Sequence, residues 1–169
     1  GLKQLESESV QCVVTSPPYW GLRSYGVDGQ LGLEKTPEEY VAKMVEVFRE
    51  VKRVLKKDGT FWLNLGDSYS AGGRGNGQKG FCKQKTNEGS LGFDIKKAPP
   101  GFKPKDLVGI PWRVAFSLQV DSWYLRSDII WSKPNPMPES VTDRPTKSHE
   151  YIFLLSKSKQ YYCLGLQPS

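Results

Sequence analysis

Metal ligands, paired cysteines and long apolar runs are all scarce in this sequence. The 169 residues include a single histidine and three widely separated cysteines, Cys12, Cys82 and Cys163. Zinc sites and disulfide frameworks need several such residues at characteristic spacings, so we expect no metal site and no disulfide network. Cysteines without a framework are typical of a reducing compartment, which predicts a cytoplasmic protein.

Membrane and secretion signals are lacking as well. No apolar run approaches the roughly 20 residues that a transmembrane helix needs. Residues 1–10 do not contain the apolar stretch of a signal peptide. We therefore expect a soluble chain that contacts no membrane.

Basic residues, by contrast, outnumber acidic ones. Lysine and arginine together number 24 against 18 for aspartate and glutamate, which gives a net charge of +6. A basic balance favours a polyanionic partner, nucleic acid first, although net charge alone does not identify it. The length suits one domain with its own core, residues 1–169.

The first half of the chain predicts a strand–helix–strand unit. Residues 11–15 are apolar, β-branched and broken by proline, which is typical of a buried strand. Thr36, Pro37 and Glu39 predict a helix start, with an N-cap, a proline in the first turn and a capping-box glutamate. Residues 60–65 predict the next strand, and such a βαβ unit implies a parallel strand pair.

The expected helix has one apolar face. Residues at spacings of three and four define this face: Val41, Met44, Phe48, Val51 and Leu55. Lys56 and Lys57 suit the negative end of the helix, and Asp58-Gly59 is expected to terminate it.

The second half of the chain predicts one more helix and two more strands. The helix is expected over residues 110–119, and the strands over 124–131 and 150–157. No helix lies between these two strands, so we expect them to pair antiparallel. The predicted fold class is therefore α/β with a mixed sheet, of which four or five strands are visible.

A long Gly-rich loop of about residues 70–105 joins the two halves. Its basic residues include Arg74, Lys79, Lys83, Lys85, Lys96 and Lys97. The loop is interpreted either as an arm that binds DNA phosphates or as a solvated loop that keeps the protein soluble. Within it, GGRGNGQKG matches a dinucleotide fingerprint by letters only, since no strand precedes it and no helix follows it.

The stretch VQCVVTSPPYW, residues 10–20, ends the first predicted strand on two prolines and two aromatic residues. In open parallel sheets, ligands bind at the carboxyl ends of the strands, where this segment is expected to lie. The prolines stiffen the backbone and leave nearby carbonyls free as acceptors. Ser16 adds a hydroxyl group, and Tyr19 and Trp20 add flat faces on which a base can stack.

Such a set of groups suits alkylation of an exocyclic amine on a nucleobase. The amine nitrogen is a poor nucleophile because its lone pair is delocalised into the ring. Oxygen atoms that accept its two hydrogens would localise this lone pair. Stacking on an aromatic ring, worth about 1–3 kcal/mol per base, would offset much of the cost of rotating the base out of the duplex.

A plainer interpretation also fits the same residues. The diproline would then only close the strand as a polyproline turn, with Tyr19 and Trp20 packed in the core. His149 and Glu150 precede the last predicted strand. The histidine suits either a substrate contact or a structural hydrogen bond.

TSPPYW resembles the catalytic motif of the amino-DNA methyltransferases, which transfer a methyl group from S-adenosylmethionine to cytosine N4 or adenine N6. Residues 21–69 and 107–158 resemble the segments that follow this motif in bacterial and phage members. The resemblance implies a Rossmann-like S-adenosylmethionine-dependent methyltransferase fold and double-stranded DNA as the partner. It also implies a role in DNA methylation and restriction–modification in a bacterial or phage-infected cell.

The resemblance also assigns roles to residues. The implied catalytic residues are Ser16, Pro17, Pro18 and Tyr19. Ser16 and the Pro17 carbonyl would accept from the target amine, and Tyr19 would stack on the flipped base. Serine before the diproline is more usual in cytosine-N4 members, so cytosine N4 is favoured over adenine N6.

Two further assignments concern the cofactor and the nucleic acid. Asp67, after the second strand, is expected to line the cofactor or base pocket and is assigned to the cofactor, with an ordinary strand-end turn as the alternative. Trp20 and the basic residues of the loop are expected to contact nucleic acid.

One family signature is not found in the sequence, namely a strand followed by a Phe-x-Gly-x-Gly loop that holds the methionine part of the cofactor. We therefore expect a partial catalytic domain whose first strand has an exposed edge. A homodimer or a complementing chain would cover this edge. Two alternative functions stay open: a nucleic-acid-binding module without chemistry, and an RNA amino-methyltransferase.

Overall fold

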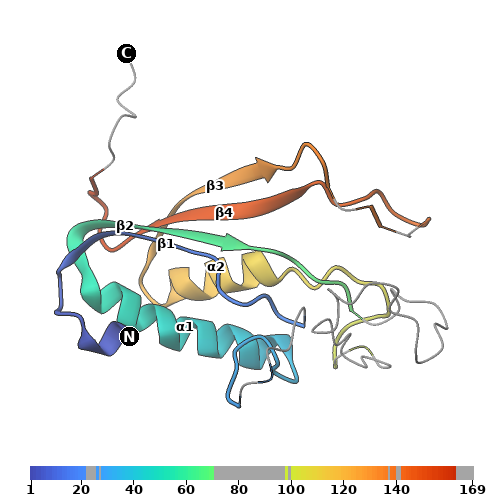
Figure 1. Cartoon of the computed structure of the whole chain (residues 1–169), viewed down its shortest axis with the longest axis horizontal. Helices are drawn as coiled ribbons and strands as arrows, with labels where there is room; N and C mark the ends of the chain where they lie inside the picture. The colour runs from blue at the N-terminus through green and yellow to red at the C-terminus, as the bar shows by residue number, and fades with distance from the viewer. Residues whose placement is uncertain are drawn as a thin grey trace.

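A computed structural model describes residues 1–21, 26, 28–70, 98, 100–136, 138–139 and 142–162. Its elements are η1 (Leu2–Gln4), β1 (Val10–Thr15), α1 (Pro37–Val54), β2 (Leu55–Leu65), α2 (Ile110–Val120), β3 (Tyr124–Ser132) and β4 (His149–Ser156). The strands form one sheet in the order β1-β2-β4-β3 (Figure 1). β1 and β2 pair in parallel, whereas β4 is antiparallel to β2 and to β3. The predicted mixed α/β sheet is therefore confirmed.

Helix α1 begins where the sequence predicts. The Thr36 hydroxyl accepts the N–H of Glu39 at 3.2 Å, and the Glu39 carboxylate accepts the N–H of Lys35 at 3.1 Å. These bonds satisfy N–H groups that have no partner inside the first turn. One face of the helix is buried and comprises Pro37, Tyr40, Met44, Phe48, Val51 and Val54.

The end of α1 differs from the prediction. The helix stops at Val54, and Leu55 has extended backbone angles (φ −68°, ψ 139°). Strand β2 therefore begins at Leu55, and the expected stop signal Asp58-Gly59 lies inside this strand. The cause is pairing across the sheet, because Leu55 is already in register with Val10 of β1.

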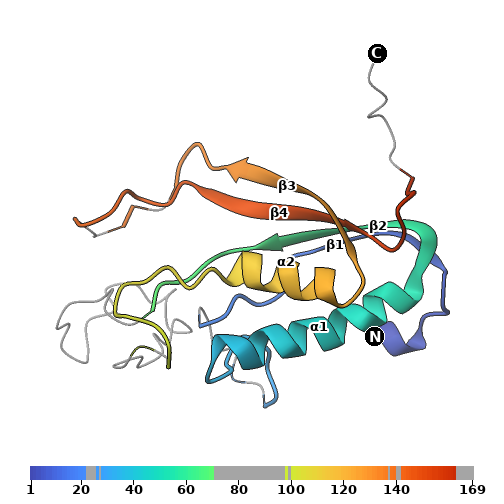
Figure 2. The same cartoon turned by 180° about the vertical axis from the view of Figure 1, so that it is seen from behind.

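The two faces of the sheet differ in what covers them. Both helices lie along the same face (Figure 2). There the core forms from sheet and helix side chains, which include Phe61, Leu63, Leu65, Phe153, Leu155, Ile110, Val114 and Leu118. No helix of the described chain covers the other face, where Val14 is 76% exposed. Strand β1 has β2 as its one neighbour in the described sheet, so its other edge is unpaired there, as expected. Its side chains, expected to be buried, are partly exposed.

None of the helices in the described ranges is long and apolar enough to cross a membrane.

Candidate active site

The Ser16–Tyr19 segment lies at the carboxyl end of β1, beside the carboxyl end of β2. Thr15, the last residue of β1, pairs with Leu63, so Ser16 follows next to Asn64 of β2. The segments that follow the two strands continue toward the same end of the sheet, where α2 also begins (Figure 1). This is the edge at which an open parallel sheet offers a ligand site.

Three polar side chains meet at this edge. The Ser16 hydroxyl lies 3.2 Å from the Tyr19 hydroxyl and 3.2 Å from the Asn64 Oδ1 atom. The Tyr19 hydroxyl donates to Asn64 Oδ1 at 2.8 Å or to Glu150 Oε2 at 3.0 Å. The Asn64 amide donates to the carbonyl of Tyr151 at 3.1 Å, which turns its oxygen toward the two hydroxyl groups.

Glu150, at the start of β4, closes this cluster. Its second carboxylate oxygen forms an ion pair with Lys133, which follows β3. Burial raises the pKa of the Glu150 carboxyl, but hydrogen bonds from Lys133 and Tyr19 outweigh burial and hold this pKa below its usual value. Glu150 is therefore a carboxylate at neutral pH. Burial, followed by the neighbouring negative charge of Glu150, raises the pKa of the Tyr19 phenol.

A hydrogen bond from helix α1 fixes the turn at Pro17-Pro18, here called the diproline corner. The Tyr40 hydroxyl, on the first turns of that helix, donates to the Pro18 carbonyl at 2.9 Å. Within the described part of the chain, the Pro17 carbonyl accepts no hydrogen bond. One carbonyl thus fixes the corner, and the adjacent one remains free for a ligand.

Gly66 forms the surface on which the Tyr19 ring lies. A Cβ atom at position 66 would be 2.5 Å from Cε2 and 2.7 Å from Cδ2 of Tyr19. These distances are far below van der Waals contact, so only glycine leaves room for the ring here. One face of the Tyr19 ring is therefore covered by the backbone after β2.

Asp67 caps helix α2. Its Oδ1 atom accepts the N–H groups of Ser68 at 2.8 Å, Gly109 at 2.9 Å and Ile110 at 2.9 Å. Two of these N–H groups belong to the start of α2, where the helix dipole favours a negative group. No hydrogen bond to Asp67 Oδ2 forms among the described residues, so this oxygen remains available to a ligand.

The expectation that Trp20 contacts nucleic acid is wrong for this structure. The Trp20 side chain is only 2% exposed and belongs to the core. Its indole N–H donates to the Glu34 carbonyl at 3.0 Å, and its own carbonyl accepts from the Ser68 hydroxyl at 2.8 Å. The indole thus anchors the loop after the diproline instead of offering a face to a base.

The other predicted nucleic-acid contacts, Arg74, Lys79, Lys83, Lys85, Lys96 and Lys97, lie outside the described residues. His149 packs edge-on against the Tyr151 ring, with 5.2 Å between ring centroids. Asn64, Lys133 and Glu150 join the site without having been assigned to it from the sequence. The one signal in the sequence that could have indicated Glu150 was the polar pair His149-Glu150 before an apolar strand.

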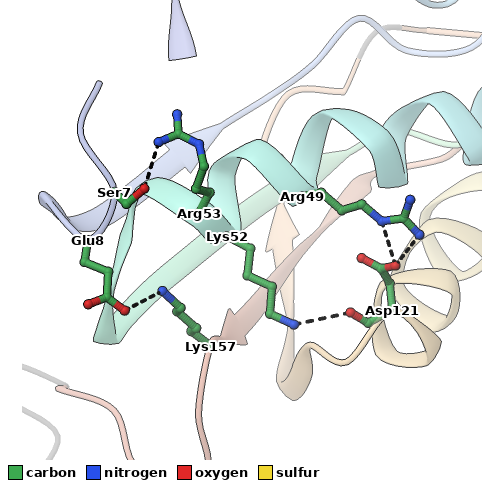
Figure 3. A pocket seen from close by; sticks show the side chains of 7 residues that line it. All are labelled: Ser7, Glu8, Arg49, Lys52, Arg53, Asp121 and Lys157. Carbon is green, nitrogen blue, oxygen red and sulfur yellow. Dashed lines mark hydrogen bonds and ion pairs between the residues drawn. The ribbon is translucent and has the colours of Figure 1, made fainter. Parts of the chain in front are cut away.

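A separate hollow of about 440 Å³ lies at the opposite end of the sheet (Figure 3). Its lining residues are Ser7, Glu8, Arg49, Lys52, Arg53, Asp121 and Lys157. Arg49 donates two hydrogen bonds to Asp121 Oδ1, at 2.9 and 2.6 Å, and Lys157 pairs with Glu8 at 3.1 Å. These basic residues already bind acceptors of the chain itself, so the hollow is a structural ion-pair network. In the described ranges, no three His, Cys, Asp or Glu side chains gather as metal ligands.

Comparison with known proteins shows which family the chain resembles. A family model described as DNA methylase matches residues 10–167. The Type II methyltransferase M.SmaI of Serratia marcescens is 59% identical over 158 residues, which cover 94% of this chain and 53% of that protein. The chain therefore spans about half the length of this relative.

Solved structures share the fold. The PvuII DNA methyltransferase, described as cytosine-N4-specific, superimposes with a TM-score of 0.62 at 21% identity and covers 95% of this chain and 46% of its own. A Thermus thermophilus protein assigned as a DNA modification methylase, solved with S-adenosyl-L-methionine, gives a TM-score of 0.59 at 23% identity, over 98% of this chain and 54% of its own.

The α/β sheet of this chain therefore shares its fold with these two proteins. The family match covers nearly the whole chain, and the chain belongs to the DNA methylase family.

Proposed function

We propose that this chain carries the catalytic half of an enzyme that methylates an exocyclic amine of double-stranded DNA, with S-adenosylmethionine as the methyl donor. Cytosine N4 is the favoured target, because serine precedes the diproline, and adenine N6 is the second. The observation that carries the proposal is the hydrogen-bonded cluster of Ser16, Tyr19 and Asn64 at the carboxyl ends of β1 and β2. Membership of the DNA methylase family supports it.

Two oxygens would receive the target amine. The Ser16 side chain is exposed, and its hydroxyl can donate inward to Asn64 or Tyr19 while its lone pairs stay available. The Pro17 carbonyl has no partner among the described residues. Hydrogen bonds from the amine to these two oxygens would localise the nitrogen lone pair for attack. The amine proton becomes acidic once the nitrogen carries the methyl group, so Ser16 need not be a strong base.

Tyr19 would hold the flipped base. One face of its ring lies on Gly66, so the base would stack on the opposite face. Such stacking contributes about 1–3 kcal/mol per base, which offsets much of the cost of unstacking the target from the duplex. The anchored hydroxyl keeps the ring in one orientation.

Bound S-adenosylmethionine supplies an electrophilic methyl group on a positively charged sulfur. The residues at the carboxyl ends of the strands fit a cofactor with a positively charged sulfur, because they present free oxygens and the carboxylates of Asp67 and Glu150. We propose that Asp67 binds the cofactor through Oδ2 while Oδ1 caps α2.

DNA and protein partners are proposed for two other regions. The basic residues of the loop at about 70–105 would bind DNA phosphates, which predicts binding that weakens as salt rises. The outer edge of β1 would pair with a further segment or with a second copy, because unpaired strand edges are normally covered.

The activity test uses radiolabelled S-adenosylmethionine with mixed-sequence DNA and, in separate reactions, with RNA. The 169-residue chain and the complete gene product are assayed side by side. After digestion to nucleosides, we expect N4-methylcytosine from the complete product. N6-methyladenine as the product would make adenine N6 the target in place of cytosine N4. Activity on RNA alone would show that the substrate is RNA and not DNA. DNA binding without any methylated nucleoside in either sample would overturn the proposal in favour of a binding module.

Two substitutions assign the residue roles. Ser16→Ala should lower the methylation rate by about 10²-fold, with little change in DNA affinity. Tyr19→Ala should weaken engagement of the target base more than cofactor binding. Equal losses of base and cofactor binding in the Tyr19 variant would contradict the stacking role.

A further inference from the structure

The direction of the hydrogen bonds between Ser16 and Glu150 can be worked out by counting hydrogens. Two hydroxyl groups, Ser16 and Tyr19, each have one hydrogen to donate. Two groups can only accept, namely the Glu150 carboxylate and the Asn64 Oδ1 atom. The Asn64 amide nitrogen donates to the Tyr151 carbonyl and also to the Glu150 carboxylate, so the Asn64 oxygen is the atom that faces the two hydroxyl groups. Each hydroxyl hydrogen therefore finds an acceptor inside the cluster.

Geometry then decides which hydroxyl uses which acceptor. Ser16 reaches Asn64 Oδ1 and the Tyr19 oxygen, both at 3.2 Å, and forms no hydrogen bond with Glu150 among the described residues. Tyr19 reaches both Asn64 Oδ1 and Glu150 Oε2. A charged acceptor forms the stronger bond, so the Tyr19 hydrogen goes to Glu150. This leaves Asn64 Oδ1 and the Tyr19 oxygen to Ser16.

Lys133 keeps Glu150 in this role. The Lys133 ammonium group pairs with Glu150 Oε1, so the other oxygen, Oε2, is the one that faces Tyr19. The lysine is itself restrained, since its backbone N–H donates to the Ser148 carbonyl at 2.8 Å and its ammonium lies 5.7 Å from the Trp131 ring centroid.

We propose that Glu150, held by Lys133, is a positioning residue that orients the Ser16 hydroxyl through Tyr19. By taking the Tyr19 hydrogen, Glu150 leaves Ser16 to donate inward, so the Ser16 lone pairs face the target amine. The inference rests on the proposed function, because it assigns Ser16 the role of amine acceptor. It adds a partner to that site from β4, far along the chain from the diproline.

The first test is a double-mutant cycle on methylation by the complete gene product. Glu150→Gln keeps the size of the side chain but offers an amide that can donate to Tyr19. Its kcat should fall by about 10- to 100-fold, the scale of one charge-assisted hydrogen bond, while KM for DNA changes by less than about threefold. Tyr19→Phe removes the hydroxyl that links the two residues, so adding Glu150→Gln to it should cause no further loss. Losses that multiply in the double variant would overturn the proposal.

A second test needs neither DNA nor cofactor. In protein labelled with ¹³C at tyrosine Cζ, the Tyr19 resonance is the one that Tyr19→Phe removes. Glu150→Gln and Lys133→Met should both shift it, because the phenol loses its charged acceptor or the group that holds that acceptor. An unchanged Tyr19 resonance in Glu150→Gln would overturn the proposal, even if the wild-type protein methylates DNA.

The matched control is Glu139→Gln. Glu139 is also a carboxylate in an ion pair, with Arg144, and is not among the hydrogen-bond partners of Tyr19 in the described part of the chain. This variant should change neither kcat nor the Tyr19 resonance, and an effect as large as that of Glu150→Gln would count against the inference. Absence of methylation by the wild-type protein would contradict the proposed function, and the resonance test would still decide the positioning role.

Discussion

Gly66 lies directly beneath the ring of Tyr19, so close that a Cβ atom there would sit 2.5 Å from the ring carbon Cε2. The ring cannot simply rotate away from an added methyl group, because its hydroxyl is bound to Asn64 and Glu150. The backbone after β2 and the diproline after β1 are thereby fitted to each other. The site depends on this contact as much as on its polar groups.

Gly66→Ala should therefore displace the Tyr19 ring. We expect a stability loss of about 1–3 kcal/mol, as for overpacked cores, together with a loss of target-base engagement. Urea unfolding measures the first, and fluorescence of a base analogue at the target position measures the second. Gly59→Ala is a matched control, because its Cβ would also crowd backbone and side-chain atoms, at 2.9–3.0 Å, but within β2 and away from Tyr19. If both variants lost base engagement equally, the effect would be one of stability alone.

Tyr40 fixes the diproline corner through its hydroxyl group, which is fully buried with the ring. Tyr40→Phe removes the donor and leaves the Pro18 carbonyl without its partner. We expect a loss of about 1–2 kcal/mol in the free energy of unfolding, measured by urea denaturation at neutral pH. Tyr124→Phe, at a 43% exposed position on β3, should change stability by less than about 0.5 kcal/mol and serves as the control.

The same hydroxyl gives a pH dependence with a definite sign. Burial first, and then the charges of Glu34 and Tyr19, raise the pKa of the Tyr40 phenol well above its usual value. In the unfolded chain the phenol ionises near pH 10. The stability that it contributes is therefore complete below pH 10 and is lost as the pH rises further. The stability difference between wild type and Tyr40→Phe should shrink above pH 10, and a difference that grows there would contradict this assignment.

The sequence predicted the elements whose signals are local. The capping residues Thr36 and Glu39 placed the start of α1, and the apolar runs placed every strand to within a few residues, except the start of β2. That start was missed because residues 55–59 are held by pairing with β1, which leaves no local signature in composition. The unpaired edge of β1 was expected from the resemblance to the family, whereas periodicity alone does not contain the order of the strands in the sheet.

The site was only partly predictable, because some of its residues belong to a local motif and others are brought in by strand pairing. Ser16 and Tyr19 belong to one short motif, whereas Asn64 and Glu150 reach Tyr19 from 45 and 131 residues away in sequence. Only the register of β2 with β4 brings those two together, with Asn64 opposite Ile152. Trp20 shows the opposite failure, since an aromatic residue beside the motif is as suited to a core as to stacking.

Asp67 allows its two proposed roles to be separated. As a cap, its Oδ1 atom accepts from the start of α2, so Asp67→Ala should destabilise the protein by about 0.5–2 kcal/mol. Asp67→Asn keeps one acceptor oxygen and should retain most of that stability. If Oδ2 also binds the cofactor, Asp67→Asn should still weaken S-adenosylmethionine binding, measured by isothermal titration. Unchanged cofactor affinity in this folded variant would leave Asp67 with the capping role alone.

Lys52 supports the far end of α2. Its ammonium donates to the carbonyl of Asp121 at 3.3 Å (Figure 3). It also donates to the carbonyl of Ser122 at 2.8 Å, where the helix dipole is negative, and lies 5.6 Å from the Trp123 ring centroid. Lys52→Met preserves the apolar stem and removes the charge. It should therefore lower the free energy of unfolding by about 1 kcal/mol.

Lys56→Met removes a charge of the same kind from an exposed position on β2 and is the control for Lys52. Urea denaturation of both variants should show a loss for Lys52→Met alone. Since the hollow around Lys52 lies at the opposite end of the sheet from Ser16, methylation per folded molecule should be unchanged. A drop in methylation without a drop in stability would instead make this basic hollow part of the functional surface.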